Sequence, residues 1–205
     1  DNPKSAGIQP GFYTLLMGIP SKDAITALLD DANRVTNKVV IPEGKRATWI
    51  LDTLAKGTGI PRSDFDTALK DYAALGLPAY AKGNPEGFLF PATYQFAPNA
   101  TATDVLTAMV DKYNGVVKGL DLESKAAAIK MTPYQIITIA SLLQVEGHPR
   151  DFAKVSRVVY NRLAAPMRLE FDSTVNYGLG QTDVIITQNE LDKDTPYNLS
   201  LIHIS

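Results

Sequence analysis

A run of uncharged residues, most of them apolar, covers Tyr134–Val145 and ends at Glu146. Thr132 and Pro133 precede this run, which is the pattern of a helix start with a threonine N-cap and a proline at the first helical position. Apolar side chains recur on nearly every face of the predicted helix, so we expect it to be buried. Gly147 follows at once and predicts the C-terminal end of the helix.

The carboxyl group of Glu146 is the feature of this helix that suggests chemistry. In the last turn it meets the negative end of the helix dipole, and apolar neighbours keep water away. Both conditions raise the pKa of a carboxyl group. A glutamic acid that stays protonated near neutral pH is what general acid catalysis of glycoside cleavage requires. A solvated glutamate at a frayed helix end is the structural alternative to this interpretation.

Other hydrophobic patterns predict short strands and amphipathic helices along the rest of the chain. The expected strands cover 11–16, 38–41 and 88–90, and the expected helices cover 21–29, 47–55, 65–74, 103–113, 121–128 and 151–163. Ser21 is expected to cap the first of these helices. Trp49, the only tryptophan, shares a helix side with Ile50 and Leu54, so we expect it in a core and not as a platform for sugar stacking.

Length and composition limit the possible functions. With 205 residues, 45% of them hydrophobic, the chain can form one sizeable core or two modest ones. The formal net charge of −2 and the scattered basic residues argue against a nucleic-acid partner. The sequence contains no cysteine, which excludes disulfides and thiolate metal sites. No stretch approaches the length of a transmembrane helix, and no signal peptide is recognisable.

The motifs of several other chemistries are missing from the sequence. The two histidines, His148 and His203, show no spacing typical of a zinc site. There is no Gly-x-Ser-x-Gly elbow of a serine hydrolase, no phosphate-binding glycine loop and no dinucleotide fingerprint. We therefore expect no metal and no cofactor. An enzyme that acts on a neutral glycan through one carboxylate survives this elimination.

Four blocks of sequence stand in a fixed order around the Glu146 helix. They read EGFLFPATY (86–94), RVVYNRL (157–163), MRLEFDSTVNYG (167–178) and TPYN (195–198). In this order and spacing the blocks resemble the endolytic murein transglycosylases, the MltG or YceG-like family. The resemblance begins at Pro10 and fades after Asn198, so it covers most of the chain.

The resemblance implies an α+β fold in which small LysM-like strand–helix units precede a mainly helical catalytic domain. The expected boundaries are 1–36 for the end of a first LysM-like unit, 37–80 for a second one and 81–205 for the catalytic domain. Turn-forming residues between Leu77 and Pro85 mark the last boundary. We expect the LysM-like units to support the catalytic domain, with glycan binding as the alternative.

The resemblance also implies an activity, because Glu146 matches the family's catalytic glutamate. It would cleave the bond between N-acetylmuramic acid and N-acetylglucosamine within nascent peptidoglycan strands, acting as acid and then as base, and leave 1,6-anhydro ends. The candidate substrate-binding residues are Gln144, Glu86, Asn161, Asp172, Tyr177 and Asn198. The implied partners are glycan strands and cell-wall synthases at the extracytoplasmic face of the bacterial cell membrane. Membrane contact would run only through an anchor missing from this chain.

Two other functions stay open at this point. A hydrolase with two carboxylates would pair Glu146 with Glu86, Glu170 or Asp172. Asp172, however, is also expected to cap a turn or a helix start. A non-catalytic peptidoglycan-binding module would keep the fold without the activity. A buried Glu146 in an open groove would favour the enzyme, and a Glu146 turned to solvent would favour the binding module.

The chain departs from the family's pattern in two places. Many relatives carry an acid two residues before the catalytic glutamate, where this chain has Gln144, which removes a like charge but keeps a hydrogen-bonding group. After Asn198 the family's sequence continues through a Gly-Leu-Pro-Pro-Gly-type loop, whereas this chain ends with LSLIHIS (199–205). We therefore expect a fragment that lacks the N-terminal anchor and the C-terminal end of the catalytic domain.

Overall fold

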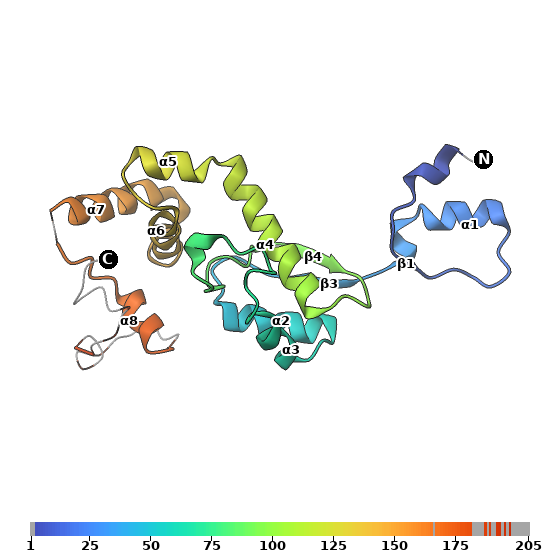
Figure 1. Ribbon diagram of the computed structural model, residues 1–205, viewed down its shortest axis with the longest axis horizontal. Helices are drawn as coiled ribbons and strands as arrows, with labels where there is room; N and C mark the ends of the chain where they lie inside the picture. Colours follow the sequence, from blue (N-terminus) through green and yellow to red (C-terminus); the bar gives the residue numbers. More distant parts are fainter. Residues whose placement is uncertain are drawn as a thin grey trace. The chain divides into compact units, whose positions relative to one another are not determined.

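The computed structural model describes residues 3–165 and 167–181, together with 187, 189, 192, 193, 195 and 197. It contains two compact units, Asp1–Val116 (unit 1) and Val117–Ser205 (unit 2) (Figure 1). Helices predominate, and the strands form two short antiparallel pairs, both of them in unit 1. The predicted α+β class is confirmed.

Unit 1 begins with a small strand–helix–strand segment. Its elements are η1 (Pro3–Gly7), β1 (Phe12–Tyr13), α1 (Ser21–Leu28), η2 (Asp31–Asn33) and β2 (Arg34–Val35). β1 pairs with β2 through Phe12↔Val35 and Tyr13↔Arg34. The predicted cap of α1 is wrong, because Ser21 is the first helical residue and Pro20 takes the cap position without a side-chain hydrogen bond.

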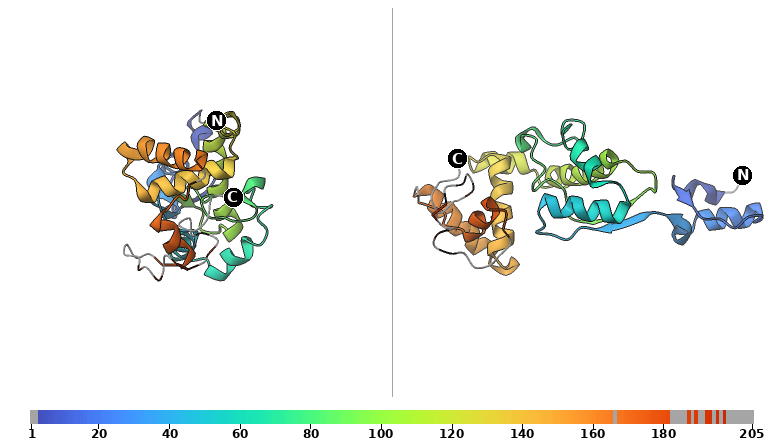
Figure 2. Two further views of the ribbon diagram at one scale, coloured as in Figure 1. Left: turned by 90° about the vertical axis from the view of Figure 1, so that its left-hand side faces the viewer. Right: turned by 90° about the horizontal axis from the view of Figure 1, so that it is seen from below.

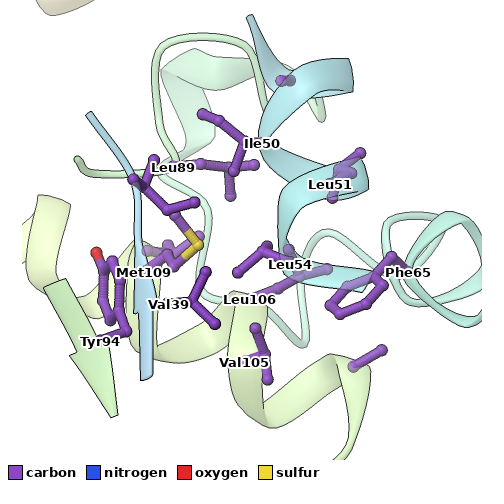
Figure 3. Close-up of a cluster of buried hydrophobic side chains, with 14 of the residues drawn as sticks. Val39, Ile50, Leu51, Leu54, Phe65, Leu89, Tyr94, Val105, Leu106 and Met109 are labelled. Atoms are coloured by element: carbon purple, nitrogen blue, oxygen red, sulfur yellow. The ribbon is translucent and has the colours of Figure 1, made fainter. Parts of the chain in front are cut away.

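The remainder of unit 1 surrounds a dense hydrophobic core. Its elements are β3 (Asn37–Val40), α2 (Ala47–Thr58), α3 (Arg62–Ala68), η3 (Ala79–Ala81), β4 (Thr93–Phe96) and α4 (Ala102–Gly119), which runs past the unit boundary. β3 and β4 pair antiparallel from Asn37↔Phe96 to Val40↔Thr93. Side chains from β3, α2, α3, β4 and α4 converge on this core (Figure 3).

The contact between β3 and α2 requires a glycine inside α2, near the end of the helix. On β3, Val39 is 3% exposed and Val40 is 56% exposed, as alternation along a strand predicts. A Cβ atom on Gly57 would lie 2.6 Å from the Val39 side chain, so only glycine lets the helix approach the strand this closely. The helix therefore continues through Gly57, past the predicted end at Ala55. It stops at Gly59, whose φ of 76° lies in the left-handed region.

Two sequence predictions for unit 1 are wrong. Trp49 is not a core residue: it is 40% exposed, with the Lys45 ammonium 5.2 Å from the ring centroid. Ile50 and Leu54, which share its helix, are buried. Residues 88–90 do not form a strand, although Phe88 and Leu89 are buried, because they lie in a turn that leads to β4.

Buried tyrosines add polar contacts to the apolar core of unit 1. The Tyr94 hydroxyl donates to the Phe90 carbonyl oxygen at 2.6 Å, and burial raises the pKa of Tyr94 to about 12. The hydroxyls of Tyr80 and Tyr113 are 3.1 Å apart. Burial, followed by this hydrogen bond, raises the pKa of Tyr113 well above its usual range.

The boundary between the two units lies at Val116/Val117, later than the expected boundary near residue 80. Residues on both sides of position 80 belong to one core, because β4 pairs with β3 and α4 contributes buried residues beside those of α2. The assignment of LysM-like units within 1–80, and of a catalytic domain that starts at 81, stays a prediction.

Unit 2 is helical over the residues that the structure describes. It contains α5 (Leu122–Ala128), α6 (Pro133–Glu146), η4 (Pro149–Asp151), α7 (Phe152–Ala164) and α8 (Asp172–Gly178). α6 and α7 pack side by side (Figure 2). Their shared core cluster consists of Ile139, Leu142, Val159 and Leu169, with Leu143, Leu163 and Phe171 among the partly buried residues around it.

The prediction that α6 is a buried helix is wrong. Only Ile139 and Leu142 are buried, whereas Tyr134 and Val145 are 38% and 66% exposed. Ile139 of α6 packs with Val159 of α7, whereas Val158 is 45% exposed on α7. One side of α6 faces the core of unit 2, and the residues that the structure describes leave its other side uncovered.

No single helix among the described residues is long and apolar enough to cross a membrane. α5 and α6 reach the required length and composition only as a pair, and the chain bends by 93° between them.

Candidate active site

The N-terminus of α6 is fixed by local hydrogen bonds. The Thr132 hydroxyl accepts from the Gln135 amide at 3.2 Å, and the Gln135 side-chain oxygen accepts from the Thr132 amide at 2.9 Å. Pro133 occupies the first helical position. This capping box confirms the predicted start of the helix and sets which residues lie in its last turn.

Glu146 is the last residue of α6, as predicted, and its side chain is exposed. Gly147 follows in an extended conformation, with φ at −128°. A Cβ atom there would lie 3.2 Å from the Leu143 carbonyl oxygen and 3.2 Å from the Phe152 ring. The glycine is thus required for close packing and not for a left-handed helix stop. The prediction that apolar neighbours shield Glu146 from water is wrong, because its side chain is exposed among the residues that the structure describes.

The Glu146 carboxylate contacts the start of α8. Its Oε1 atom accepts from the Ser173 backbone N–H at 3.4 Å. This hydrogen bond is longer than usual, and catalytic hydrogen bonds are often long in a ligand-free enzyme. An N–H that points at one carboxylate oxygen restricts the rotation of an otherwise exposed side chain.

The segment before α8 is attached to α7 by Arg162. The guanidinium Nη1 donates to the Leu169 carbonyl oxygen and lies 3.6 Å from the Glu170 carboxylate. The Met167 amide donates to the Arg162 carbonyl oxygen at 2.8 Å. Glu170 has a φ of 54°, a left-handed conformation that is strained for a residue with a side chain. The side chain of Leu169 is fully buried.

Two other candidate residues lie on α8. Asp172 is exposed at the first helical position, next to Ser173. The prediction that the Asp172 side chain caps the helix is wrong, because Phe171 takes the cap position without a side-chain hydrogen bond. The Thr174 hydroxyl donates to the Phe171 carbonyl oxygen at 2.7 Å. Tyr177 is partly buried and packs edge-on against Tyr197, with ring centroids 4.9 Å apart.

The remaining unit 2 candidates lie on the surfaces of α6 and α7. Gln144 is exposed on α6, but residues two positions apart on a helix do not face each other, so its side chain leaves the helix on a different side from Glu146. Asn161 is exposed on α7. Contact of Gln144 and Asn161 with substrate stays a prediction. His148 lies in the turn after α6, where it accepts weakly from the Arg150 amide at 3.5 Å.

Glu86 belongs to unit 1, where it stabilises a helix start. Both of its carboxylate oxygens accept from the Ala47 amide, at 3.2 Å each, so Glu86 caps α2 from a distant part of the sequence. A role for Glu86 in glycan binding stays a prediction. Asn198 lies outside the described residues.

A depression of about 550 Å³ lies in unit 1. It is lined by residues of the α2–α3 turn and by the start of α4, including Gly59, Pro61, Thr67 and Thr101. None of the predicted site residues lines it. In the described part of the chain, no group of three or more His, Cys, Asp or Glu side chains could hold a metal ion.

The sequence analysis missed Ser173 as a neighbour of Glu146. The interaction uses a backbone N–H, which carries no signature in a sequence. The hydroxyl oxygen of Ser173 is also buried, with no hydrogen-bond partner in the part of the chain that is described. A helix start predicted at Asp172 could have indicated that free amides lie there. It could not have shown that they face α6.

The sequence is similar to a known family and to curated proteins of that family. The model of the YceG-like family matches residues 1–203. An endolytic murein transglycosylase of Bacillus subtilis (strain 168) is 29% identical over an alignment that covers 95% of this chain and 58% of the relative. One of Streptococcus pneumoniae (strain ATCC BAA-255 / R6) is 27% identical over 94% of this chain and 40% of the relative.

The fold is shared with a solved structure. A yceG-like protein of Listeria monocytogenes, known from a crystal structure, matches with a TM-score of 0.70 and 25% identity, over 95% of this chain and 69% of that one. The chain spans only about half the length of the two transglycosylases it matches. The family model covers nearly every residue, which confirms the resemblance predicted from the sequence, and the chain belongs to the YceG-like family.

Proposed function

We propose that this chain is the part of an endolytic murein transglycosylase that carries the catalytic glutamate, Glu146. The observation that carries the proposal is the position of this residue. It stands at the end of a capped helix, with one carboxylate oxygen held by the Ser173 amide. The names of the Bacillus and Streptococcus relatives support the reaction class.

The reaction uses one carboxyl group twice. Protonated Glu146 first donates its proton to the oxygen that links N-acetylmuramic acid to N-acetylglucosamine, and the bond from that oxygen to the anomeric carbon breaks. The carboxylate then accepts the proton of the muramyl 6-hydroxyl, whose oxygen bonds to the anomeric carbon. A 1,6-anhydro end forms, no water is consumed, and Glu146 returns to its starting protonation state.

The surroundings of Glu146 suit the second half of this cycle. The Ser173 N–H bond at one carboxylate oxygen orients the side chain that must take the 6-hydroxyl proton. The first half requires the protonated form. A bound glycan strand would favour this form by covering the exposed side chain and removing water from it. Asp172 and Tyr177 are the proposed glycan contacts nearest to Ser173 in sequence, and all three residues lie on α8.

The substrate and location follow from the same proposal. Peptidoglycan glycan strands are the polymer, and the reaction takes place outside the cytoplasmic membrane, beside the synthases that make the strands. Neither a metal nor a cofactor takes part in these steps.

A glutamine substitution tests the role of Glu146. Glu146→Gln keeps the size of the side chain but removes proton transfer, which contributes roughly 10²–10⁴-fold to such reactions. In the full-length protein, digestion of purified peptidoglycan should yield anhydro-muropeptides by mass spectrometry, and the variant should yield almost none. Glu123→Gln, the same change at an exposed glutamate of α5, is the control and should digest normally. Near wild-type turnover by Glu146→Gln would refute the proposal.

The ends of the released glycan fragments distinguish a lytic transglycosylase from a hydrolase. Reducing ends in place of anhydro ends would identify a hydrolase, with Asp172 as the first candidate for a second carboxylate because it adjoins Ser173.

One observation favours a second function, a peptidoglycan-binding module without activity. Glu146 is exposed, which is the arrangement expected for a binding module. A sedimentation assay with insoluble peptidoglycan distinguishes the two functions. Binding by the wild type without any release of soluble fragments would identify the module, whereas release that depends on Glu146 would identify the enzyme.

A further inference from the structure

Arg162 lies on α7 and is absent from the set of residues proposed to touch the glycan. Its side chain is about one-third exposed, and its guanidinium points to the backbone of the segment that leads into α8. That segment delivers Ser173 to Glu146. The structure therefore connects Arg162 to the proposed catalytic residue through a short piece of chain.

The connection can be followed bond by bond. The Arg162 guanidinium donates to the Leu169 carbonyl oxygen. Three residues separate Leu169 from Ser173, whose amide donates to Glu146 at 3.4 Å. One of the three, Glu170, has a φ of 54° and reverses the chain. A left-handed residue keeps its conformation only where neighbouring contacts hold it, and the bonds from Arg162 flank this position on the Leu169 side.

We infer that Arg162 is a positioning residue: by holding the Leu169 carbonyl oxygen, it places the Ser173 amide against the carboxylate of Glu146. This inference rests on the proposed role of Glu146 for its effect on catalysis. The ion pair with Glu170 contributes little, because the Glu170 side chain is 62% exposed and the two charged atoms are 3.6 Å apart. The hydrogen bond to the Leu169 carbonyl oxygen is therefore the interaction that positions the segment.

Two substitutions at Arg162 separate the carbonyl contact from the charge. Arg162→Met and Arg162→Gln both remove the positive charge, but only glutamine keeps an N–H donor for the Leu169 carbonyl oxygen. In the full-length enzyme, Arg162→Met should lower kcat by roughly tenfold to a hundredfold, the scale of a 1 Å misplacement, with KM little changed. Arg162→Gln should retain most of kcat, and Glu170→Gln should match the wild type.

An NMR measurement tests the positioning without relying on activity. In the ¹⁵N-labelled protein, the Ser173 amide proton should shift as Glu146 titrates, and Glu146→Gln should abolish this shift. Arg162→Met should abolish it as well, while Arg162→Gln should keep it. A purely structural role for Arg162 would lower the thermal stability of the Met variant but leave the titration of the Ser173 amide in place.

Several outcomes would overturn the inference. A folded Arg162→Met variant with wild-type kcat and a titrating Ser173 amide would do so, and so would equal behaviour of the Met and Gln variants. If Arg162→Met loses its circular dichroism signal, Arg162→Leu, which also lacks an N–H donor, replaces it, and a wild-type kcat with an unchanged Ser173 titration in that variant would count against Arg162. A fully active Glu146→Gln would defeat the proposed function, while the amide titration would still report on Arg162.

Discussion

Units 1 and 2 bury their apolar residues to different degrees. Among the residues that the structure describes, the main core cluster of unit 1 contains sixteen buried residues, from Val39 to Val110, whereas that of unit 2 contains four. In unit 1 the paired strands β3 and β4 contribute buried side chains to the core, and so do the helices α2, α3 and α4. In unit 2, α6 packs through one side only.

The same difference fits the proposed function, in which unit 1 gives support and unit 2 carries the chemistry. The polar groups of unit 1 mostly stabilise its fold: Glu86 caps α2, and Tyr94 bonds to a backbone carbonyl. In unit 2 the loosely covered helix α6 ends at the exposed Glu146, beside strained backbone at Glu170. Functional segments are drawn from the less stable parts of a fold, because they must contact a ligand and adjust to it.

The largest expected effect is the loss of a core aromatic residue in unit 1. Phe65 is fully buried on α3, so Phe65→Ala should lower the free energy of unfolding of unit 1 by about 3–5 kcal/mol. Trp49, the only tryptophan, lies in unit 1, so its fluorescence during guanidinium unfolding reports on this unit. The same substitution at the exposed Phe12 should change the stability by less than about 0.5 kcal/mol. Equal losses at the two positions would contradict the dense core described for unit 1.

A smaller loss of stability is expected when a side chain in the core of unit 2 is truncated. Ile139→Ala removes a buried side chain that contacts the four-residue cluster, and the usual cost is about 2–5 kcal/mol. We expect a value near 2 kcal/mol, because a half-covered helix can move to fill the cavity. Helical circular dichroism at 222 nm during urea unfolding measures the change, with Ile129→Ala at an exposed site as the control. A cost above that of Phe65→Ala would reverse the ranking of the two cores.

The limits of the sequence analysis follow the same division. Local signals were sufficient for α6, because its start depends on Thr132, Pro133 and Gln135, which are neighbours in sequence. Its burial could not be predicted in this way. Apolar residues around a whole helix show that it can be covered on any side, but not which sides have a neighbour.

Tertiary contacts caused the other errors. α2 continues past its predicted end at Ala55, and it keeps Gly57 because Val39 leaves no room there for a side chain. Trp49 and Ile50 are adjacent on α2, and a rotation of 100° between them decides which one is buried. In the candidate site, the sequence identified Glu146 through its helix. It gave no sign of Ser173 or Arg162, whose roles depend on backbone atoms from other segments.

Alkaline pH should weaken unit 1 through Tyr94. Burial raises the pKa of Tyr94 to about 12, above the value near 10 of an unfolded chain. The protonated hydroxyl therefore stabilises the fold fully below pH 10, and this contribution is lost as the pH rises from 10 to 12. Unfolding followed by Trp49 fluorescence should show a stability gap between wild type and Tyr94→Phe that shrinks over this range. A gap that stays constant from pH 9 to 12 would rule out this source of stability.

The smallest expected effect concerns the strained residue of unit 2. Glu170 has a φ of 54°, a conformation that costs a residue with a Cβ atom roughly 1 kcal/mol and costs glycine little. Glu170→Gly and Glu170→Ala both remove the exposed ion pair with Arg162, so their comparison isolates the backbone strain. The glycine variant should be more stable than the alanine variant by about 1 kcal/mol in urea unfolding followed at 222 nm. An alanine variant of equal or greater stability would show that the segment relaxes freely. In that case the backbone between Leu169 and Ser173 would not be rigid enough for Arg162 to position the amide that contacts Glu146.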